Sequence, residues 1–311
     1  MLKILCLGAG AVGGYFFGRL AESGAADVTF LVREGRKRQL DAGGLRIDSP
    51  LGNAVVPVNA ITDAAGLSSP PDIVVLTCKA YDLASAIAAV QPAIAPTTTI
   101  LPLLNGLSHM DVLNATFGRE RVLGGLASLH VTMLADGTIK HSGNWRFITF
   151  GEQDASSSDR VAALKRAFDG AKGVSANAVT DVSQKMWDKL VMLGTLAGMT
   201  TLMRASVGEI VRAGGAPVSL AMLERNSLIS EKSGFPVSPE LLAGYRKLFA
   251  DPTAELTASM LRDMERGGPV EADHIVGHLV NLARRHGIPD ELHTAALANL
   301  KVYEQKRAPK A

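Results

Sequence analysis

The stretch from residue 3 to residue 36 constrains the fold more than any other part of the chain. An apolar run leads into Gly8, Gly10 and Gly13, then into a helical pattern and a second apolar run. This order predicts strand, glycine turn, helix and strand. The first glycine permits a tight turn, the second lets a pyrophosphate approach the backbone, and the third lets the helix pack closely on the strand. Because free N–H groups at the helix start bind phosphate, the stretch predicts a dinucleotide-binding domain.

Arg33 indicates which dinucleotide is bound. It ends the second apolar run, 20 residues after Gly13. An acidic residue there would bind the ribose 2′-OH of NAD, whereas an arginine accommodates the 2′-phosphate of NADP. The bases at 36–38 could add positive charge, or they are ordinary surface residues of a helix start, and Glu34 is adjacent. The sequence favours NADP (NADPH) as the cofactor.

Composition excludes several classes of protein. A length of 311 residues suggests two domains, and 47% hydrophobic residues provide a large core, which argues against disorder. The net charge of +2 comes without a long single-sign run, so neither nucleic acid nor a membrane surface is an expected partner. Lys3 interrupts the apolar start, which is unlike a signal peptide, and no run reaches the ~20 apolar residues of a membrane span. We expect a cytoplasmic protein with Cys6 and Cys78 as thiols. The oligomeric state stays open, a homodimer included.

The first half of the chain alternates strand and helix patterns. The apolar run DIVVLTC over 72–78 is typical of a strand covered on both faces of its sheet. Hairpin signals stand later, at Asp136-Gly137 and at Gly143-Asn144. The fold class predicted is α/β, a doubly wound parallel sheet with an antiparallel extension. Further elements are predicted as strands over 99–104, 128–134, 138–141 and 146–151 and as helices over 81–90 and 108–117.

Beyond residue 178 the strand patterns end and helical periodicity dominates. One apolar stripe has the spacing of a helix face: Met186, Leu190, Leu193 and Ala197. Glycine and proline clusters separate further helical segments. We therefore predict a Rossmann domain over 1–178 and an all-helical substrate-binding and catalytic domain over 179–311.

Five motifs resemble the ketopantoate reductase (2-dehydropantoate 2-reductase) family, and they extend over nearly the whole chain. They are GAGAVGG at the start, LTCKAYD around Lys79, LLNGLS around Asn105, MWDKL around Lys189, and SMLRDMERGGPVEADHIVGHL from Ser259. The resemblance implies the same two-domain fold, NADPH-dependent reduction of a 2-oxo acid to a 2-hydroxy acid, and a place in pantothenate biosynthesis.

The resemblance also implies the roles of individual residues. Lys189 matches the proton donor to the substrate carbonyl, Glu271 the acid near it, and Ser259 a substrate contact. Lys79 and Asn105 match residues bordering nicotinamide and substrate, and the cofactor site matches Gly8, Gly10, Gly13 and Arg33. The chemistry agrees, because hydride addition to a ketone leaves charge on oxygen. A lysine can donate there if burial lowers its pKa, while a carboxylate opposes that shift. Lys185, one turn earlier, is the alternative donor.

Three other functions compete with this reading. Glu271, His274 and His278 share a helical face with metal-ligand spacing, although hydride transfer needs no metal and none is expected. A noncatalytic NADP-binding sensor is compatible with the fold, which hosts many functions. A decarboxylating 3-hydroxyacid dehydrogenase would share the two-domain plan.

The substrate itself is open because the chain departs from the family at three positions. Leu193, Ala197 and Leu256 stand where the family usually has asparagine. Either nearby threonines supply the missing hydrogen bonds, or the site is apolar and suits a 2-oxo acid with an alkyl or aryl side chain. The threonines concerned are Thr195, Thr201 and Thr257.

Overall fold

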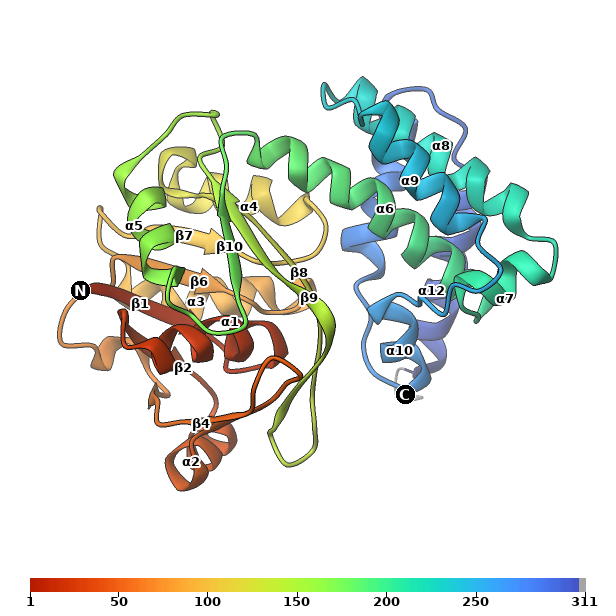
Figure 1. The fold of residues 1–311 in the computed structure, drawn as a ribbon. Coiled ribbons are helices and arrows are strands. Elements are labelled where there is room, and N and C mark those ends of the chain that lie inside the picture. Colours follow the sequence, from red (N-terminus) through yellow and green to blue (C-terminus); the bar gives the residue numbers. More distant parts are fainter. Residues whose placement is uncertain (308–311) are drawn as a thin grey trace. The chain divides into compact units, whose positions relative to one another are not determined.

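The computed structural model describes residues 1–307, and the chain divides into two compact units (Figure 1). The first comprises Met1–Leu104 and Met110–Ser183. The second comprises Asn105–His109 and the chain from Gln184 onward. The short segment Asn105–His109 therefore belongs with the helical unit, although its neighbours in sequence belong to the first.

A five-stranded parallel sheet forms the centre of the first unit, with strand order β5-β2-β1-β6-β7. The chain builds outward from β1 to β2 and then crosses to the other side of β1 to form β6. Ligands of doubly wound sheets bind at this kind of switch point, beyond the carboxyl ends of the strands. The strands are β1 (Leu2–Leu7), β2 (Ala26–Leu31), β5 (Asn59–Ile61), β6 (Ile73–Leu76) and β7 (Thr99–Pro102).

Helices connect these strands as the sequence predicts. They are α1 (Ala11–Ser23), α2 (Glu34–Gly43), α3 (Leu83–Val90) and α4 (Ser108–Phe117), with 3-10 turns η1 (Ala64–Gly66), η2 (Ala80–Asp82) and η3 (Gln91–Ala93). The strand expected over 72–78 is shorter, because the chain leaves β6 after Leu76. Thr77 and Cys78 are thereby placed in the loop that follows β6.

The expected antiparallel extension is a separate sheet with the order β10-β9-β3-β4, and β8 pairs with β9. Its strands are β3 (Leu45–Asp48), β4 (Ala54–Val56), β8 (Gly124–Met133), β9 (Ile139–Gly151) and β10 (Ser175–Ala178). Helix α1 packs against both sheets at close range. A Cβ at Gly14 would lie 2.2 Å from Ile139 Cδ1, and one at Gly18 would lie 2.3 Å from Leu45 Cδ2.

One of the two predicted hairpins is correct and the other is wrong. Asp136-Gly137 forms the turn between β8 and β9, with a 2.9 Å hydrogen bond from Leu134 N to Thr138 O. Gly143-Asn144 instead lies within β9, where the register jumps between Leu129 and His130. Three residues, 143–145, bulge out of the ladder at that point. A bulge uses the same positive-φ glycine as a turn, so the local sequence did not distinguish them.

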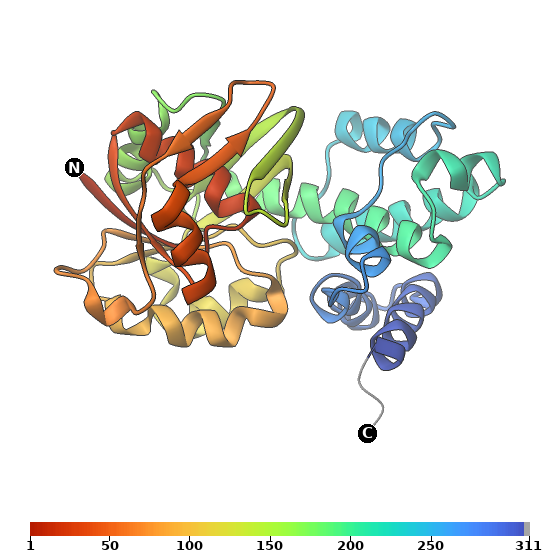
Figure 2. The same cartoon turned by 90° about the horizontal axis from the view of Figure 1, so that it is seen from below.

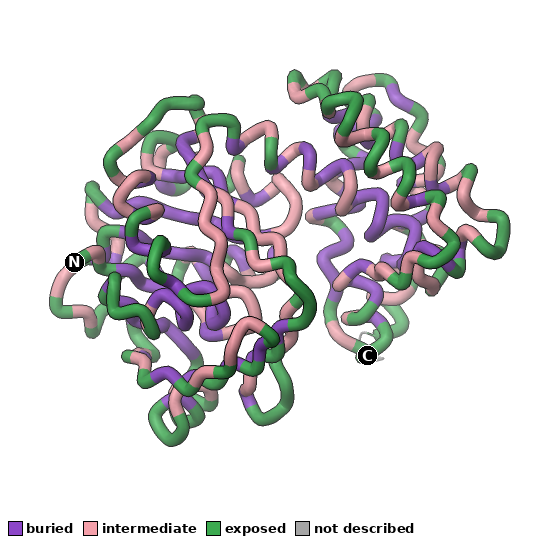
Figure 3. The backbone as a smooth tube through the Cα atoms, in the orientation of Figure 1, coloured by how far each residue is buried: buried purple, intermediate pink, exposed green. Residues whose placement is uncertain are grey.

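The second unit is helical throughout, and α6 lies at its centre (Figure 2). The helices are α6 (Val182–Met203), α7 (Val207–Arg212), α8 (Ala216–Lys232), α9 (Pro239–Phe249), α10 (Ser259–Glu265), a π-helical segment η5 (Asp273–Gly277), α11 (His278–Arg285) and α12 (Glu291–Arg307). Buried side chains of α6 belong to the same core cluster as those of the following helices α7, α8, α9, α10 and α12, and burial concentrates in the interior of each unit (Figure 3). Within residues 1–307 no helix has both the length and the apolarity to cross a membrane.

Candidate active site

The glycine loop after β1 has the geometry of a dinucleotide site. Gly8 adopts a φ of +91°, and its N–H donates to Leu31 O at 2.9 Å. A Cβ at Gly13 would lie 2.6 Å from both Gly8 O and Thr77 Oγ1, so only glycine fits there. A Cβ at Gly10 would meet nothing within 4 Å. The backbone at Gly10 is thus approachable, as the sequence predicts for a phosphate contact.

The start of α1 adds the electrostatics that an anion needs. Gly10 is the N-cap of α1, and no acidic residue lies in the first turn. The first N–H groups of a helix lack partners within it, and this end carries the positive end of the helix dipole. Thr77, which the sequence analysis did not single out, donates to Leu7 O at 3.0 Å and braces the loop. Lys79 follows it, half-buried, as the N-cap of η2.

The four bases near α2 differ in their surroundings, and Arg38, which lies inside the helix and not at its start, is exposed. Arg33 is exposed at the N-cap of α2, where it can reach a ligand phosphate. Lys37 pairs with Asp41 on the same helix at 2.7 Å. Arg36 is partly buried, and its guanidinium donates to two backbone carbonyls. Arg33 is therefore the base that remains best suited to a 2′-phosphate.

In the second unit, Lys189 lies on α6 and its Nζ donates to Asn105 Oδ1 at 3.1 Å. Burial lowers the pKa of Lys189 to about 8, although the negative charge of Glu271 acts in the opposite direction. Glu271 is itself only 4% exposed. By contrast, the alternative donor Lys185 is exposed. A buried ammonium whose pKa is close to neutral is suited to proton donation.

Asn105 is held in place by the π-helical segment. Gly106 has a φ of +81°, and a Cβ there would lie 3.0 Å from His274 O. Ser108 Oγ donates to the same carbonyl at 3.4 Å. The motifs around Asn105 and Glu271 are therefore packed together by the backbone of His274, a contact that sequence reasoning missed. π-Helical turns frequently occur at functional sites.

His109 ends this short segment and is 1% exposed. Within residues 1–307 neither of its ring nitrogens has a hydrogen-bond partner. Burial lowers the pKa of His109 to about 3, and the charges of His274, Lys189 and His278 lower it further. The imidazole is therefore neutral at physiological pH. It contributes no positive charge that would compete with the ammonium of Lys189.

The residues of the metal alternative, Glu271, His274 and His278, lie at the π-helical segment and beside it. Among residues 1–307 there is no group of three or more His, Cys, Asp or Glu side chains that could hold a metal ion. The face shared by Glu271, His274 and His278 was expected on a regular α-helix, but 273–277 are π-helical. Ser259 is half-buried at the first position of α10, and its contact with substrate stays a prediction.

Leu193 and Ala197, the α6 residues at positions where the family usually has asparagine, belong to the hydrophobic core of the second unit or pack against it. Ala197 is 1% exposed, and Leu193 is partly buried against the same cluster. Thr195 and Thr201 are fully buried, and their hydroxyls donate to Val191 O and Ala197 O at 2.8 and 2.6 Å. These two threonines use their protons within their own helix.

A glycine loop at the start of a helix in one unit, and a lysine influenced by a buried carboxylate in the other, are the features expected of a two-domain oxidoreductase. Two family models match this chain, each over a different part of it. Residues 4–155 match "Ketopantoate reductase PanE/ApbA", and residues 181–304 match "Ketopantoate reductase PanE/ApbA C terminal". The chain belongs to the ketopantoate reductase family.

Individual relatives extend over the whole chain. "Uncharacterized oxidoreductase YkpB" of Bacillus subtilis is 36% identical over 98% of this chain and 100% of its own length. The crystal structure of 2-dehydropantoate 2-reductase from Methylococcus capsulatus is 26% identical with a TM-score of 0.89, covering 99% of both chains. D-mandelate dehydrogenase, solved with NADH and anilino(oxo)acetate, has a TM-score of 0.83 at 19% identity, covering 98% of this chain and 99% of its own. This last likeness shows the fold alone.

Proposed function

We propose that the protein reduces a 2-oxo acid to a 2-hydroxy acid with NADPH, as a 2-dehydropantoate 2-reductase or a close relative. The observation that carries the proposal is the buried amine of Lys189, with a pKa of about 8, bonded to Asn105 and influenced by Glu271. The glycine loop fits a dinucleotide, since Gly10 is open and the start of α1 carries no acid. When bound, the nicotinamide supplies the hydride.

Lys189 then acts as the general acid. Its ammonium holds a proton at Nζ, and negative charge grows on the carbonyl oxygen as the hydride is added to C2. The proton moves from Nζ to that oxygen, which gives the hydroxyl of the product. Asn105 orients the amine by accepting its hydrogen bond at 3.1 Å, and the carboxylate of Glu271 favours the charged form before the transfer. Ser259 is our candidate for a contact with the substrate.

The preference for NADPH rests on Arg33. Its exposed guanidinium follows β2, where it can bind two oxygens of a 2′-phosphate. D-mandelate dehydrogenase was solved with NADH, so this fold accepts the dinucleotide that lacks the 2′-phosphate. Arg33 is the feature of this chain that favours the phosphorylated form.

A turnover assay with both dinucleotides tests the function. We expect NADPH oxidation, followed by absorbance, with ketopantoate or another 2-oxo acid from a panel of branched alkyl and aryl compounds. Binding of NADPH without turnover of any 2-oxo acid would contradict the proposal and favour a sensor. Release of CO₂ from a 3-hydroxyacid would instead support a decarboxylating dehydrogenase.

A second candidate substrate class is the less polar 2-oxo acids. The hydrogen bonds that the threonine hydroxyls of α6 make within their own helix favour it. Thr195 and Thr201 donate to their own helix, so they do not replace the donors that asparagine at 193 and 197 would supply. Thr257 is the remaining candidate, and its hydroxyl accepts a bond from Arg262 at 3.2 Å. A buried substrate hydroxyl left without a partner costs about 1–3 kcal/mol.

Replacing Leu193 by Asn separates the two substrate classes. If the site is apolar, L193N should raise kcat/KM for ketopantoate relative to an aryl 2-oxo acid, by about tenfold for one regained hydrogen bond. L256A, which removes apolar volume without adding an amide, serves as the comparison. A wild-type preference for ketopantoate over every alkyl and aryl acid would rule out the apolar site.

A further inference from the structure

The guanidinium of Arg36 lies between the glycine loop and the turn that joins β8 to β9. Its Nε donates to Ala9 O at 3.1 Å, and its Nη1 donates to Gly137 O at 2.9 Å and to Gln39 Oε1 at 3.1 Å. Ala9 is the residue between the first two glycines of the loop and is 2% exposed. One side chain of α2 thus fixes a peptide group of the loop.

The orientation of that peptide determines where the next N–H points. The peptide joining Ala9 to Gly10 is trans and planar, so its C=O and N–H point in opposite directions. Since the carbonyl of Ala9 points at Arg36, the N–H of Gly10 points away from Arg36. The space that a side chain at Gly10 would occupy is open, with no atom within 4 Å.

On the side away from the glycine loop, the guanidinium of Arg36 packs closely against the turn between β8 and β9. Gly137 has a φ of +82°, and a Cβ there would lie 2.2 Å from Arg36 Nη1 and 2.8 Å from Gln39 Oε1. The turn is also tied to β3, because Arg46 Nη2 donates to Asp136 O at 2.9 Å. Burial, together with the positive charge of Arg46, lowers the pKa of Arg36. A partly buried cation already bonded to two carbonyls is less suited than the exposed Arg33 to act as a surface charge for phosphate.

We propose that Arg36 is a positioning residue of the dinucleotide site, which holds the Ala9 carbonyl so that the Gly10 N–H faces the pyrophosphate. The inference rests on the dinucleotide binding proposed above. It assigns Arg36 a role different from that of Arg33. Arg33 would bind the 2′-phosphate that only NADPH carries. Arg36 would position the loop that binds the pyrophosphate, which NADPH and NADH share.

Binding measurements with R36M test this division. We expect R36M to weaken NADPH and NADH by the same factor, on the order of tenfold for one misdirected charge-assisted contact, so that their affinity ratio is unchanged. ADP should lose a similar factor, whereas adenosine, which lacks the pyrophosphate, should bind as in wild type. R36K, which keeps one donor for Ala9 O, should recover part of the loss. K37M removes the neighbouring positive charge of α2 and should leave every Kd within about twofold.

A second variant, G137A, disturbs the position of Arg36 without replacing the arginine. G137A keeps the arginine but displaces Nη1, so it should also weaken both dinucleotides equally. Weakening of NADPH alone in R36M would overturn the proposal, because it would make Arg36 a 2′-phosphate ligand. Loss of adenosine binding would also overturn it, since the change would then be general damage to the unit. Unchanged Kd values in R36M, with wild type reducing 2-oxo acids, would reject the role of Arg36 and leave the proposed function standing.

Discussion

Lys189 is the residue on which the proposed chemistry depends, because burial lowers the pKa of its amine to about 8. We predict that K189M lowers kcat by about 10²- to 10⁴-fold, the range of general acid catalysis, with the Kd of NADPH nearly unchanged. The matched control is K185M, on the same helix one turn earlier, where the lysine is exposed. Near-normal turnover in K189M, or an equal loss in K185M, would remove Lys189 from the mechanism.

The pH dependence of turnover follows from the same amine. Reduction needs the protonated form, and the pKa of Lys189 is about 8. We therefore expect kcat to be constant below pH 8 and to fall about tenfold per unit above it. Because the charge of Glu271 raises the pKa of Lys189, E271Q should move this alkaline limb to lower pH. A limb that stays in place in E271Q would show that Glu271 does not influence the titrating group.

Single residues of the site were predictable where a local motif carries them. The glycines and Asn105 stand in motifs whose chemistry is local. The structure shows the positive φ of Gly8 and the close approach at Gly13, whereas the role of Asn105 beside nicotinamide and substrate stays a prediction. Arg36 was read only as a source of charge, because its partner Gly137 is 101 residues away. Sequence spacing says nothing about such a contact.

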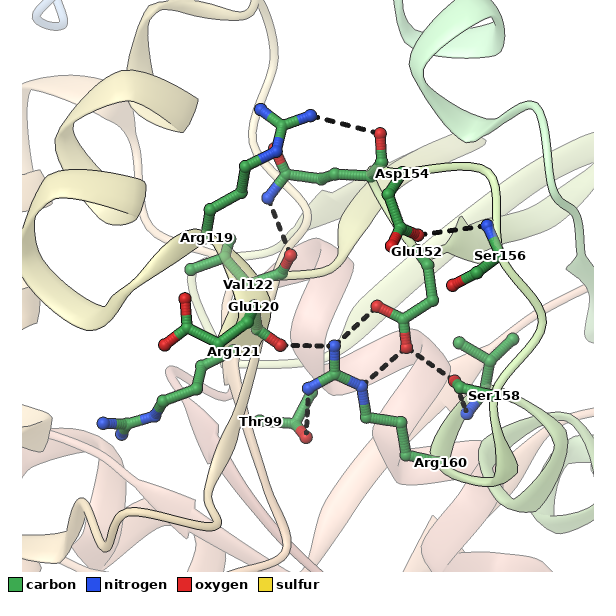
Figure 4. A network of polar contacts seen from close by, with 12 residues as sticks. Thr99, Arg119, Glu120, Arg121, Val122, Glu152, Asp154, Ser156, Ser158 and Arg160 are labelled. Carbon is green, nitrogen blue, oxygen red and sulfur yellow. Dashed lines mark hydrogen bonds and ion pairs between the residues drawn. The ribbon is translucent and has the colours of Figure 1, made fainter.

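At the scale of elements, the network around Arg160 joins four parts of the first unit (Figure 4). Arg160 lies on α5 (Asp159–Phe168) and makes a two-pronged contact with Glu152, with Nε to Oε1 at 2.7 Å and Nη2 to Oε2 at 2.5 Å. It also donates to Thr99 Oγ1 of β7 at 3.3 Å and to Glu120 O of η4 (Arg119–Arg121) at 2.7 Å. The sheets and α5 are thereby connected through one guanidinium.

We predict that E152Q destabilises the first unit by about 1–3 kcal/mol, because it removes the charge of a buried carboxylate that is bonded to a partly buried guanidinium. Chemical denaturation measures this loss. The control is D169N, which removes the exposed partner of Lys165 on the same helix and should cost less than about 1 kcal/mol. A loss in E152Q no larger than that in D169N would contradict the prediction.

The stability that Glu152 provides should depend on pH. Burial raises its pKa, but hydrogen bonds from Arg160 and Ser158 outweigh burial and bring the pKa below its usual 4.5. In acid the unfolded chain therefore takes up this proton first, so the contribution is complete above pH 4.5 and is lost as pH falls below it. In E152Q the free energy of unfolding should show a smaller decline over that range than in wild type.

Elements were predictable where their periodicity is long and regular, as in α1 and α6. Strands β3 and β4 were missed because they have only four and three residues, and because β3 is held in its sheet by pairing with β9, which is distant in sequence. The bulge at 143–145 was read as a turn because its glycine has a positive φ. The π-helical turn at 273–277 was read as α-helix, since one extra residue in a turn hardly alters an apolar pattern.

At the scale of the whole molecule, each unit has its own buried core, and so each can unfold in its own transition. A dinucleotide bound by the first unit should stabilise that transition selectively. At a free concentration of 100 times its Kd, NADPH adds about 2.7 kcal/mol. For a unit of this size that is roughly 5–10 °C in Tm. Calorimetry can follow the transitions separately.

The same measurement tests the choice of cofactor. Removing charge-assisted bonds costs about 1.5–3 kcal/mol, roughly ten- to a hundredfold in Kd. NADH at the same concentration should therefore raise the Tm of the first unit much less than NADPH does. In R33A the shift with NADPH should shrink to the size seen with NADH, and the shift with NADH should be unchanged. Equal shifts for the two dinucleotides in wild type would show that Arg33 does not select the 2′-phosphate, because selection must appear as a difference in binding free energy between the two.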